Sequence, residues 1–272
     1  MIKADFHIHT NLCDGADSPE EMVKAAIDMG FKHLGFSGHM DPENGVPMDT
    51  KKYREEIREV QKKYSGEIDI LLGGEVDYYF EGDTSDLEFK IGSTHTLKMK
   101  DGSMFSVDDT EEILKKYCDE YYNGDYYALA KDYFETEVHI IEKVKPDFIG
   151  HFDLVTRFND SMNFIDEDDP RYYKKALETL EYLSKEDIPF EINCGAVNRG
   201  RKSDFYPNRR LLKALNEFGG RIILSSDAHD KKHIGASFSE AAKTVLECGF
   251  KSTCILVHNE KGGITLKEIP LE

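Results

Sequence analysis

Apolar residues along the 272-residue chain occur in two alternating patterns. Short continuous apolar runs are typical of buried parallel strands, and a spacing of three or four residues is typical of amphipathic helices. The first pattern predicts strands at residues 2–6, 33–37, 68–78, 89–94, 147–152, 189–195, 221–229, 253–257 and 264–269. The second pattern predicts helices at residues 19–29, 50–63, 109–143, 170–185, 208–218 and 237–248.

The first helix carries local start and stop signals. Ser18 is expected to be the N-cap, Pro19 suits the first helical position, and Glu21 completes a capping box. Gly30 supplies the stop, because glycine adopts the left-handed conformation at a helix end without strain. These signals place a helix directly after the loop that follows the first strand.

The alternation of strands and helices favours a parallel sheet, either closed as a barrel or open and doubly wound. No GxGxxG motif follows the first strand, which weakens the dinucleotide-binding version of the open sheet. The chain shows no linker rich in Pro or Gly and no internal repeat. We therefore predict the α/β class, with a single distorted barrel over residues 1–272. The Tyr-rich stretch 109–143 would be an enlarged connection near the barrel mouth.

Composition limits the partners and the compartment that the chain suits. The formal net charge of −18 disfavours nucleic acid, because proteins that bind its backbone need a basic face. No apolar run of about 18 residues indicates a membrane span, and the opening "MIKADFHIH" has no secretory pattern. Five scattered cysteines without CxxC spacing favour free thiols in a reducing compartment. We expect a cytoplasmic protein whose oligomeric state the sequence leaves open.

Residues that suit metal ions gather at the carboxyl ends of the predicted strands, where barrels carry their active sites. They are His7, His9, Asp14, His39, Glu75, His95, His151, Asp227 and His229. His7 and His9 lie two residues apart, so an extended backbone points both side chains the same way. The remaining histidines fall elsewhere, and we expect structural or surface roles for His33, His139, His233 and His258.

The donor types indicate which metals the site would take. Imidazole together with carboxylate suits Zn²⁺, Fe²⁺ or Mn²⁺, and the lack of clustered cysteines argues against a closed structural zinc site. Asp17 is a second candidate beside Asp14 in the first loop. The sequence therefore predicts a metal centre at the barrel mouth.

Six short motifs, taken in chain order, resemble those of the PHP (polymerase and histidinol phosphatase) superfamily. They are DFHIHT, GFSGH, GGEVDY, IGSTH, IGHFD and SSDAH, and they run from Asp5 to His229. More closely, they resemble the histidinol-phosphate phosphatase branch. The resemblance implies a distorted, TIM-like (β/α)7 barrel with a metal site at the carboxyl ends of its strands. It also implies hydrolysis of L-histidinol phosphate in histidine biosynthesis.

The resemblance implies two or three divalent metals and three groups of ligands. The groups are His7, His9, Glu75 and Asp227; Glu75, His95 and His151; and Asp14, His39 and His229. Glu75 would bridge the first two metals. Asp14 matches the spacing of the family better than Asp17 does.

A metal cluster of this kind suits a small phosphate monoester as substrate. Three divalent ions would outweigh three carboxylate ligands, so an acidic protein can still present a local anion trap. A water that bridges two metals is acidified toward hydroxide and can attack phosphorus in line. Arg157 and Arg199 follow strands, and their guanidinium forks match phosphate oxygens. Arg201 and Lys202 are adjacent alternatives for the same role.

Two other functions stay open at this point. One is a PHP-type phosphoesterase that acts on a nucleotide, an oligonucleotide or phosphotyrosine. The other is a non-catalytic metal-binding module, although every expected ligand position is kept. The segment 117–137, rich in tyrosine and acidic residues, would form either a wall for a cationic substrate or a solvated helical surface. The sequence does not assign the group that protonates the leaving alkoxide.

Overall fold

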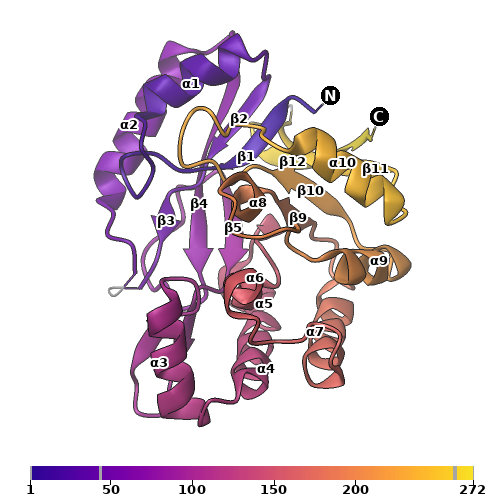
Figure 1. Ribbon diagram of the computed structural model, residues 1–272. Helices are drawn as coiled ribbons and strands as arrows, with labels where there is room; N and C mark the ends of the chain where they lie inside the picture. Colours follow the sequence, from indigo (N-terminus) through magenta and orange to yellow (C-terminus); the bar gives the residue numbers. More distant parts are fainter. Residues whose placement is uncertain (1, 43–44, 260–261, 272) are drawn as a thin grey trace.

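The computed structural model describes residues 2–42, 45–259 and 262–271 of the chain. Its centre is a curled sheet with helices around its outer side (Figure 1). The strands of this sheet are β1 (Ala4–Ile8), β2 (His33–Phe36), β3 (His39–Met40), β4 (Asp69–Asp77), β5 (Phe89–Ser93), β8 (Phe148–Ile149), β9 (Phe190–Asn193), β10 (Ile222–Ser225), β11 (Ser252–His258) and β12 (Ile264–Pro270). A separate antiparallel hairpin consists of β6 (Thr96–Lys98) and β7 (Met104–Ser106).

The sheet is parallel over most of its width. Its strand order is β1-β2-β4-β5-β8-β9-β10-β11-β12, and β3 also pairs with β4. Neighbours from β1 to β11 run parallel, and β12 pairs antiparallel with β11. A parallel bridge between Ile8 and Ala228 brings the segment after β10 beside the end of β1. This bridge places the two predicted ligand pairs, one from each segment, next to each other.

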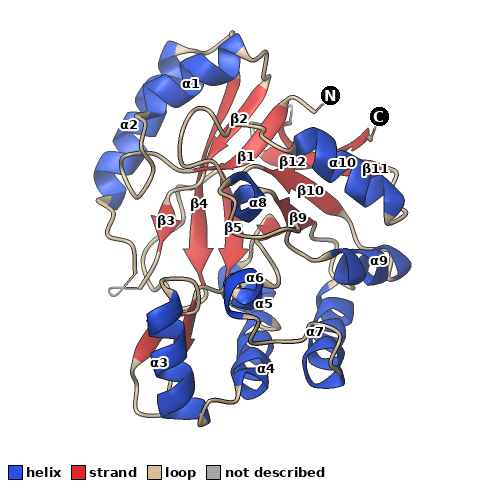
Figure 2. Cartoon of the chain, in the orientation of Figure 1, coloured by secondary structure: helices blue, strands red, loops and turns tan. Residues whose placement is uncertain are grey.

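The helices lie outside the strands (Figure 2). They are α1 (Pro19–Asp28), α2 (Thr50–Lys63), α3 (Glu111–Tyr122), α4 (Tyr126–Glu137), α5 (Ile140–Val144), α6 (Asn159–Met162), α7 (Pro170–Leu183), α8 (Gly195–Asn198), α9 (Arg209–Glu217) and α10 (Phe238–Glu247), with a 3-10 helix, η1, at Leu154–Thr156. The capping box predicted at the first helix is confirmed, because Ser18 and Glu21 each accept the other's backbone N–H. α3 and α6 lie beyond the carboxyl ends of β4 and β5 (Figure 1).

Large side chains from one face of the sheet fill the inside of the curl. Phe6, Phe89, Phe148 and Ile223 come from four different strands and belong to one buried cluster. A Cβ at Gly73 would lie 2.2 Å from the ring of Phe89, so only glycine leaves room for that ring. The other face of the sheet packs against the helices and forms the larger part of the core.

The predicted α/β class is confirmed, and the structure corrects several of the predicted boundaries. The helical stretch 109–143 is three helices, interrupted where Asn123 and Gly124 both adopt positive φ. The strand expected at 221–229 ends at Ser225, and the chain then turns through Asp227, whose φ is 50°. The sequence pattern did not predict β3 or the β6–β7 hairpin, because strands of two or three residues are too short to show a periodicity.

Two expectations from composition can be compared with the structure directly. Within the described residues, no helix has both the length and the apolar character needed to cross a membrane. The five cysteines are all free thiols, as their spacing predicts.

Candidate active site

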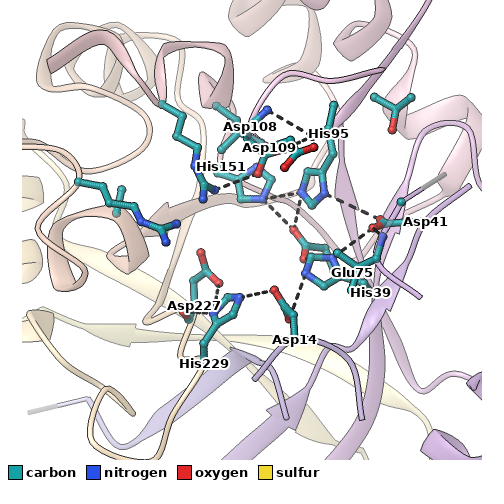
Figure 3. A pocket seen from close by; sticks show the side chains of 18 of the residues that line it. Asp14, His39, Asp41, Glu75, His95, Asp108, Asp109, His151, Asp227 and His229 are labelled. Atoms are coloured by element: carbon teal, nitrogen blue, oxygen red, sulfur yellow. Dashed lines mark hydrogen bonds and ion pairs between the residues drawn. The ribbon is translucent and has the colours of Figure 1, made fainter. Parts of the chain in front are cut away.

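The residues predicted to bind metal come together at the carboxyl edge of the curled sheet. His7 lies in β1, Glu75 lies near the end of β4, and His39 begins β3. The others lie in the loops that follow β1, β5, β8 and β10. They surround or underlie a cavity of about 620 Å³, and Figure 3 shows several of them converging on its floor.

The first predicted ligand group is the most deeply buried. Glu75 Oε2 lies 3.3 Å from His7 Nε2 and 3.5 Å from His9 Nε2. Asp227 Oδ1 lies 3.8 Å from His7 Nε2 and 3.5 Å from His9 Nε2. A tetrahedral ion with bonds of about 2.1 Å has donor atoms about 3.4 Å apart. The spacing of His7, His9 and Glu75 therefore fits one metal ion, and Asp227 lies at a similar distance from both histidines.

Glu75 also reaches the second predicted group through its other oxygen. Glu75 Oε1 lies 3.0 Å from His95 Nε2 and 2.7 Å from His151 Nε2. The two imidazole nitrogens lie 3.1 Å apart. One carboxylate thus faces two separate groups of nitrogen donors, which is the arrangement of a bridging ligand.

The third predicted group lies nearer the solvent. Asp14 Oδ1 lies 3.5 Å from His39 Nε2, and Asp14 Oδ2 lies 3.1 Å from His229 Nε2. His9 Nδ1 lies 3.6 Å from Asp14 Oδ1 as well. Asp17, the alternative candidate in this loop, instead accepts the backbone N–H and the ammonium of Lys231. The structure therefore favours Asp14 over Asp17 as a ligand.

Buried nitrogen atoms in this cluster lack the partners that a closed protein interior requires. His7 Nε2, His9 Nε2 and His39 Nδ1 have no hydrogen-bond partner among the described residues. A buried polar atom without a partner costs free energy, and native proteins satisfy almost all of them. Unpaired imidazole nitrogens that face carboxylates fit a divalent metal, which would accept their lone pairs.

Glu191, which the sequence reasoning missed, holds His7 from behind. Its Oε1 lies 2.5 Å from His7 Nδ1, and its Oε2 accepts the backbone N–H of His151 at 2.7 Å. Ser225 donates its hydroxyl to Oε1 as well. Because the Nδ1–H of His7 is hydrogen-bonded to Glu191, the lone pair of Nε2 faces Glu75 and is free to bind a metal. A glutamate inside the apolar strand segment "PFEINCG" was the sequence signal for this role.

The electrostatics of the cluster favour charged carboxylates. Burial opposes the ionisation of Glu75, but the positive charges of His7 and His95 outweigh it and hold its pKa well below the usual range. Burial likewise opposes the ionisation of Asp227, while Arg199 and His7 lower its pKa strongly. Burial lowers the pKa of His9, and repulsion from His229 and His39 lowers it further. The carboxylates are therefore in the ionised form that binds metals and His9 is in the neutral form, while a metal bound to His7 or His95 would replace a proton.

Both arginines predicted to bind phosphate line the cavity, and so does Arg201. Arg157 pairs with Asp108 at 2.9 Å, and Arg199 pairs with Asp227 at 3.0 Å. Partial burial and the like charges of Arg157 and Arg199 lower the pKa of Arg201. Three guanidinium groups at one wall of the cavity create a positive potential that suits the binding of an anion.

Carboxylates also line the cavity, and one of them, Asp108, is the partner of Arg157. Asp41, Asp108 and Asp109 line the cavity, and Figure 3 shows Asp108 and Asp109 on the same side as His95. Asp41 Oδ1 lies 3.9 Å from His95 Nδ1 and has no hydrogen-bond partner among the described residues. The sequence reasoning missed all three, because Asp41 follows β3 and the other two follow β7, strands of two and three residues that give no periodic signal.

Other residues weighed from the sequence lie outside the cavity. Within the described part of the chain, no residue of 117–137 lines it, and the segment 96–109 lines it instead. The four remaining histidines pair with nearby carboxylates: His33 and His258 with Asp69, His233 with Asp230, and His139 with Glu142. These pairs agree with structural or surface roles.

The fold and the site together are those of an α/β protein whose curled parallel sheet carries a candidate metal centre of histidines and carboxylates at its carboxyl edge. The chain belongs to the PHP domain family, since the model of the PHP domain matches residues 5–195, well over half of its length. The match confirms the resemblance that the six motifs indicated.

Named relatives span almost the whole chain. A probable histidinol-phosphatase of Deinococcus radiodurans is 29% identical over 90% of this chain and 93% of its own. A probable histidinol-phosphatase of Schizosaccharomyces pombe is 25% identical over 93% of this chain and 89% of its own. The crystal structure of histidinol phosphate phosphatase from Lactococcus lactis, in complex with zinc, L-histidinol and phosphate, superposes with a TM-score of 0.73. It is 22% identical and covers 97% of this chain and 98% of its own, which shows a shared fold.

Proposed function

We propose that this protein is a histidinol-phosphatase, which hydrolyses L-histidinol phosphate to L-histidinol and phosphate in histidine biosynthesis. The observation that carries the proposal is one cavity in which the predicted ligand groups meet three arginines. Relatives named histidinol-phosphatase, aligned over nine-tenths of the chain, support the choice of substrate.

We infer that the cluster holds two or three divalent metals, with zinc, iron or manganese as candidates. His7, His9, Glu75 and Asp227 would hold one, and Glu75 would extend to a second. The second would be completed by His95 and His151, and Asp14, His39 and His229 would hold a third. Metals bound there supply Lewis acidity, which lowers the pKa of a water molecule and neutralises charge on phosphate. The Lactococcus lactis structure is a complex with zinc, which supports divalent metal binding by this chain as well.

The protein's own residues would bind and orient the phosphate. Arg157 and Arg199 are each held by a carboxylate, so their guanidinium groups are positioned before the substrate arrives. Arg201 adds a third positive charge, and no carboxylate among the described residues forms an ion pair with it. Together they would hold the phosphate oxygens in a fixed orientation against the ligand cluster.

The acidic part of the wall suits the other end of the substrate. Histidinol phosphate carries an ammonium group and an imidazole, both of which carboxylates can bind. Asp41 and Asp109 line the cavity and would supply that negative charge. A cavity with an arginine side and a carboxylate side favours a phosphate monoester that is cationic at its far end.

We infer a distorted (β/α)7 barrel that occupies residues 1–272 as one domain. Its seven strands would be β1, β2, β4, β5, β8, β9 and β10, with the Ile8–Ala228 bridge joining the last to the first. Free thiols at all five cysteines support a cytoplasmic location.

The test is a substrate panel with defined metals. Metal-stripped protein, reconstituted separately with zinc, manganese and iron, is assayed on L-histidinol phosphate, p-nitrophenyl phosphate, nucleoside monophosphates, a phosphotyrosine peptide and a short oligonucleotide. We expect kcat/KM for histidinol phosphate to exceed the other values by orders of magnitude, and metal-stripped protein to be folded but inactive. Comparable values for nucleotides would favour a PHP phosphoesterase of different specificity. No hydrolysis with any metal would favour a non-catalytic module.

A further inference from the structure

Lys202 is a lysine whose charged end lies inside the protein. Its side chain is 2% exposed, although lysine is almost never buried without a partner. Its ammonium donates to Thr156 Oγ1 at 2.8 Å and lies 3.3 Å from Glu167 Oε1. The same ammonium lies 5.3 Å from the centre of the Tyr206 ring. These contacts give the buried charge a fixed place.

Lys202 and its partner Thr156 lie in the two segments that carry the arginines of the cavity. Thr156 is the last residue of η1 and directly precedes Arg157. Lys202 itself follows Arg201, just after α8 and the turn that carries Arg199. The ammonium therefore joins the two segments from which the three guanidinium groups project.

Glu167 extends this connection further. Its Oε1 accepts from Asn159 Nδ2 at 2.9 Å, and its Oε2 accepts from Asn208 Nδ2 at 2.7 Å. Asn159 lies just after Arg157, and Asn208 is the N-cap of α9 beyond the Arg199–Lys202 turn. The contacts of Lys202 and Glu167 thus connect Thr156 and Asn159, which flank Arg157, with Lys202 and Asn208, which follow Arg199 and Arg201.

Lys202 is absent from the described residues that line the cavity, whereas Arg157, Arg199 and Arg201 are among them. A direct contact between this ammonium and a phosphate, one of the alternatives raised by the sequence, does not fit its burial. We propose that Lys202 is a positioning residue, which locks the two arginine-bearing segments in the register that binds phosphate. The inference rests on the proposed phosphatase function and adds to it a residue that the substrate never touches.

The structure indicates how to remove the ammonium with little other damage. Methionine matches lysine in length and lacks the charge, so Lys202→Met keeps the apolar stem. Glu167 keeps its two asparagine donors in this variant, and Thr156 keeps its bond to the carbonyl of Asp153 at 2.8 Å. The uncompensated charge on Glu167 is removed in the double variant Lys202→Met/Glu167→Gln. Thr156→Val tests the same connection from the other side.

The experiment measures phosphate handling in the metal-loaded enzyme. The readouts are kcat and KM for p-nitrophenyl phosphate, the inhibition constant of inorganic phosphate, metal content and the melting temperature. We expect Lys202→Met and the double variant to weaken phosphate inhibition and kcat/KM by roughly 10- to 100-fold, with metal content unchanged. Thr156→Val should move the same readouts in the same direction by a smaller factor. Lys185→Met, an exposed lysine that pairs with Glu181 on the surface, is the matched control and should change none of them.

A double-mutant cycle with Arg157→Ala locates the effect. If Lys202 acts by positioning Arg157, Lys202→Met should cost much less in the Arg157→Ala background than in the native one. A lower melting temperature with unchanged phosphate inhibition would overturn the proposal and leave a purely structural role. Failure of the substrate assignment has a different signature, because phosphate inhibition would still weaken while histidinol phosphate showed no preference. If Lys202→Met does not fold, Thr156→Val with native phosphate inhibition overturns the proposal in its place.

Discussion

Glu191 Oε1 lies 2.5 Å from His7 Nδ1, and both side chains are fully buried. The contact decides which nitrogen of His7 faces Glu75, because the nitrogen that donates to Glu191 cannot also bind a metal. Burial opposes a charge on His7, but Glu191 and Glu75 raise its pKa well above the usual range. A divalent metal at Nε2 would take the place of that proton.

Replacement of Glu191 should therefore weaken metal binding without removing any ligand. Glu191→Gln should lower the affinity for the most tightly held metal by roughly 10- to 100-fold, as loss of such supporting carboxylates does elsewhere. Metal content after dialysis against graded chelator concentrations measures the effect. Glu186→Gln, at an exposed position near the start of the same strand, is the control. Native metal retention in Glu191→Gln would contradict the role given to this carboxylate.

The two arginines predicted from the sequence should differ when each is removed. Arg157→Ala should cost about 1.5–3 kcal/mol of transition-state stabilisation, or one to two decades in kcat/KM, with full metal content. Arg199→Ala should lose metal as well, because its guanidinium lies 3.0 Å from both Asp227 Oδ2 and His229 Nδ1. Parallel kinetics and metal analysis separate the two outcomes, with the exposed Arg171→Ala as control. Equal metal content in both variants would show that Arg199 does not support the ligands.

Much of the site could be predicted because its residues follow strands with clear apolar runs. His7, His9 and Asp227 were placed at strand ends, and parallel strands bring such ends together. Asp41 and Asp108 could not be placed, because they follow β3 and β7, which are too short to give a periodic signal. Glu191 could be seen as an oddity within an apolar strand, but the sequence does not show which buried group it meets.

The Tyr-rich region shows the same limit for the fold. Its helical character could be predicted from spacing, and α3, α4 and α5 are there. That this region does not line the cavity could not be predicted, because composition does not show which part of a long connection faces the site. The described wall is instead built by residues around the β6–β7 hairpin, including Thr96 and Ser106. Three-residue strands give no periodic signal that would have revealed it.

Glu137 provides a prediction on stability and pH. It is buried on α4, and Thr94 donates its hydroxyl to Glu137 Oε2 at 2.5 Å. Burial raises the pKa of Glu137 from 4.5 to about 8, and the Thr94 hydrogen bond only partly opposes this. Between these values the folded protein holds a proton that the unfolded chain releases. Stability due to this group is therefore full below pH 4.5 and falls as the pH rises to about 8.

Glu137→Gln keeps the shape of the protonated side chain and removes the titration. Its free energy of unfolding should match the native value near pH 5 and exceed it at pH 8–9, by an amount on the order of a few kcal/mol. Urea unfolding of both proteins across this range measures the difference. Glu135→Gln, on the same helix at the surface, should show no such trend. A difference that does not change with pH would contradict a raised pKa at Glu137.

Asp14 provides a prediction on the leaving group of the proposed substrate. It lies 3.5 Å from His39 Nε2 and 3.1 Å from His229 Nε2, at the solvent side of the cluster. Hydrolysis of histidinol phosphate expels the unactivated primary alkoxide of histidinol, which needs a cation or a proton at its oxygen, whereas p-nitrophenolate is stable by itself. Asp14→Ala should therefore lower kcat/KM for histidinol phosphate by a larger factor than for p-nitrophenyl phosphate.

The comparison is between two substrates of one variant, so errors in protein or metal concentration cancel in the ratio. We expect the ratio of the two kcat/KM values to fall by roughly tenfold or more in Asp14→Ala, since help to a poor leaving group is worth at least that much. Asp17→Ala is the matched control, because Asp17 lies in the same loop but binds Lys231 outside the cluster. Its ratio should stay native. An equal loss on both substrates in Asp14→Ala would mean that the residue supports the cluster as a whole and gives the leaving oxygen no particular help.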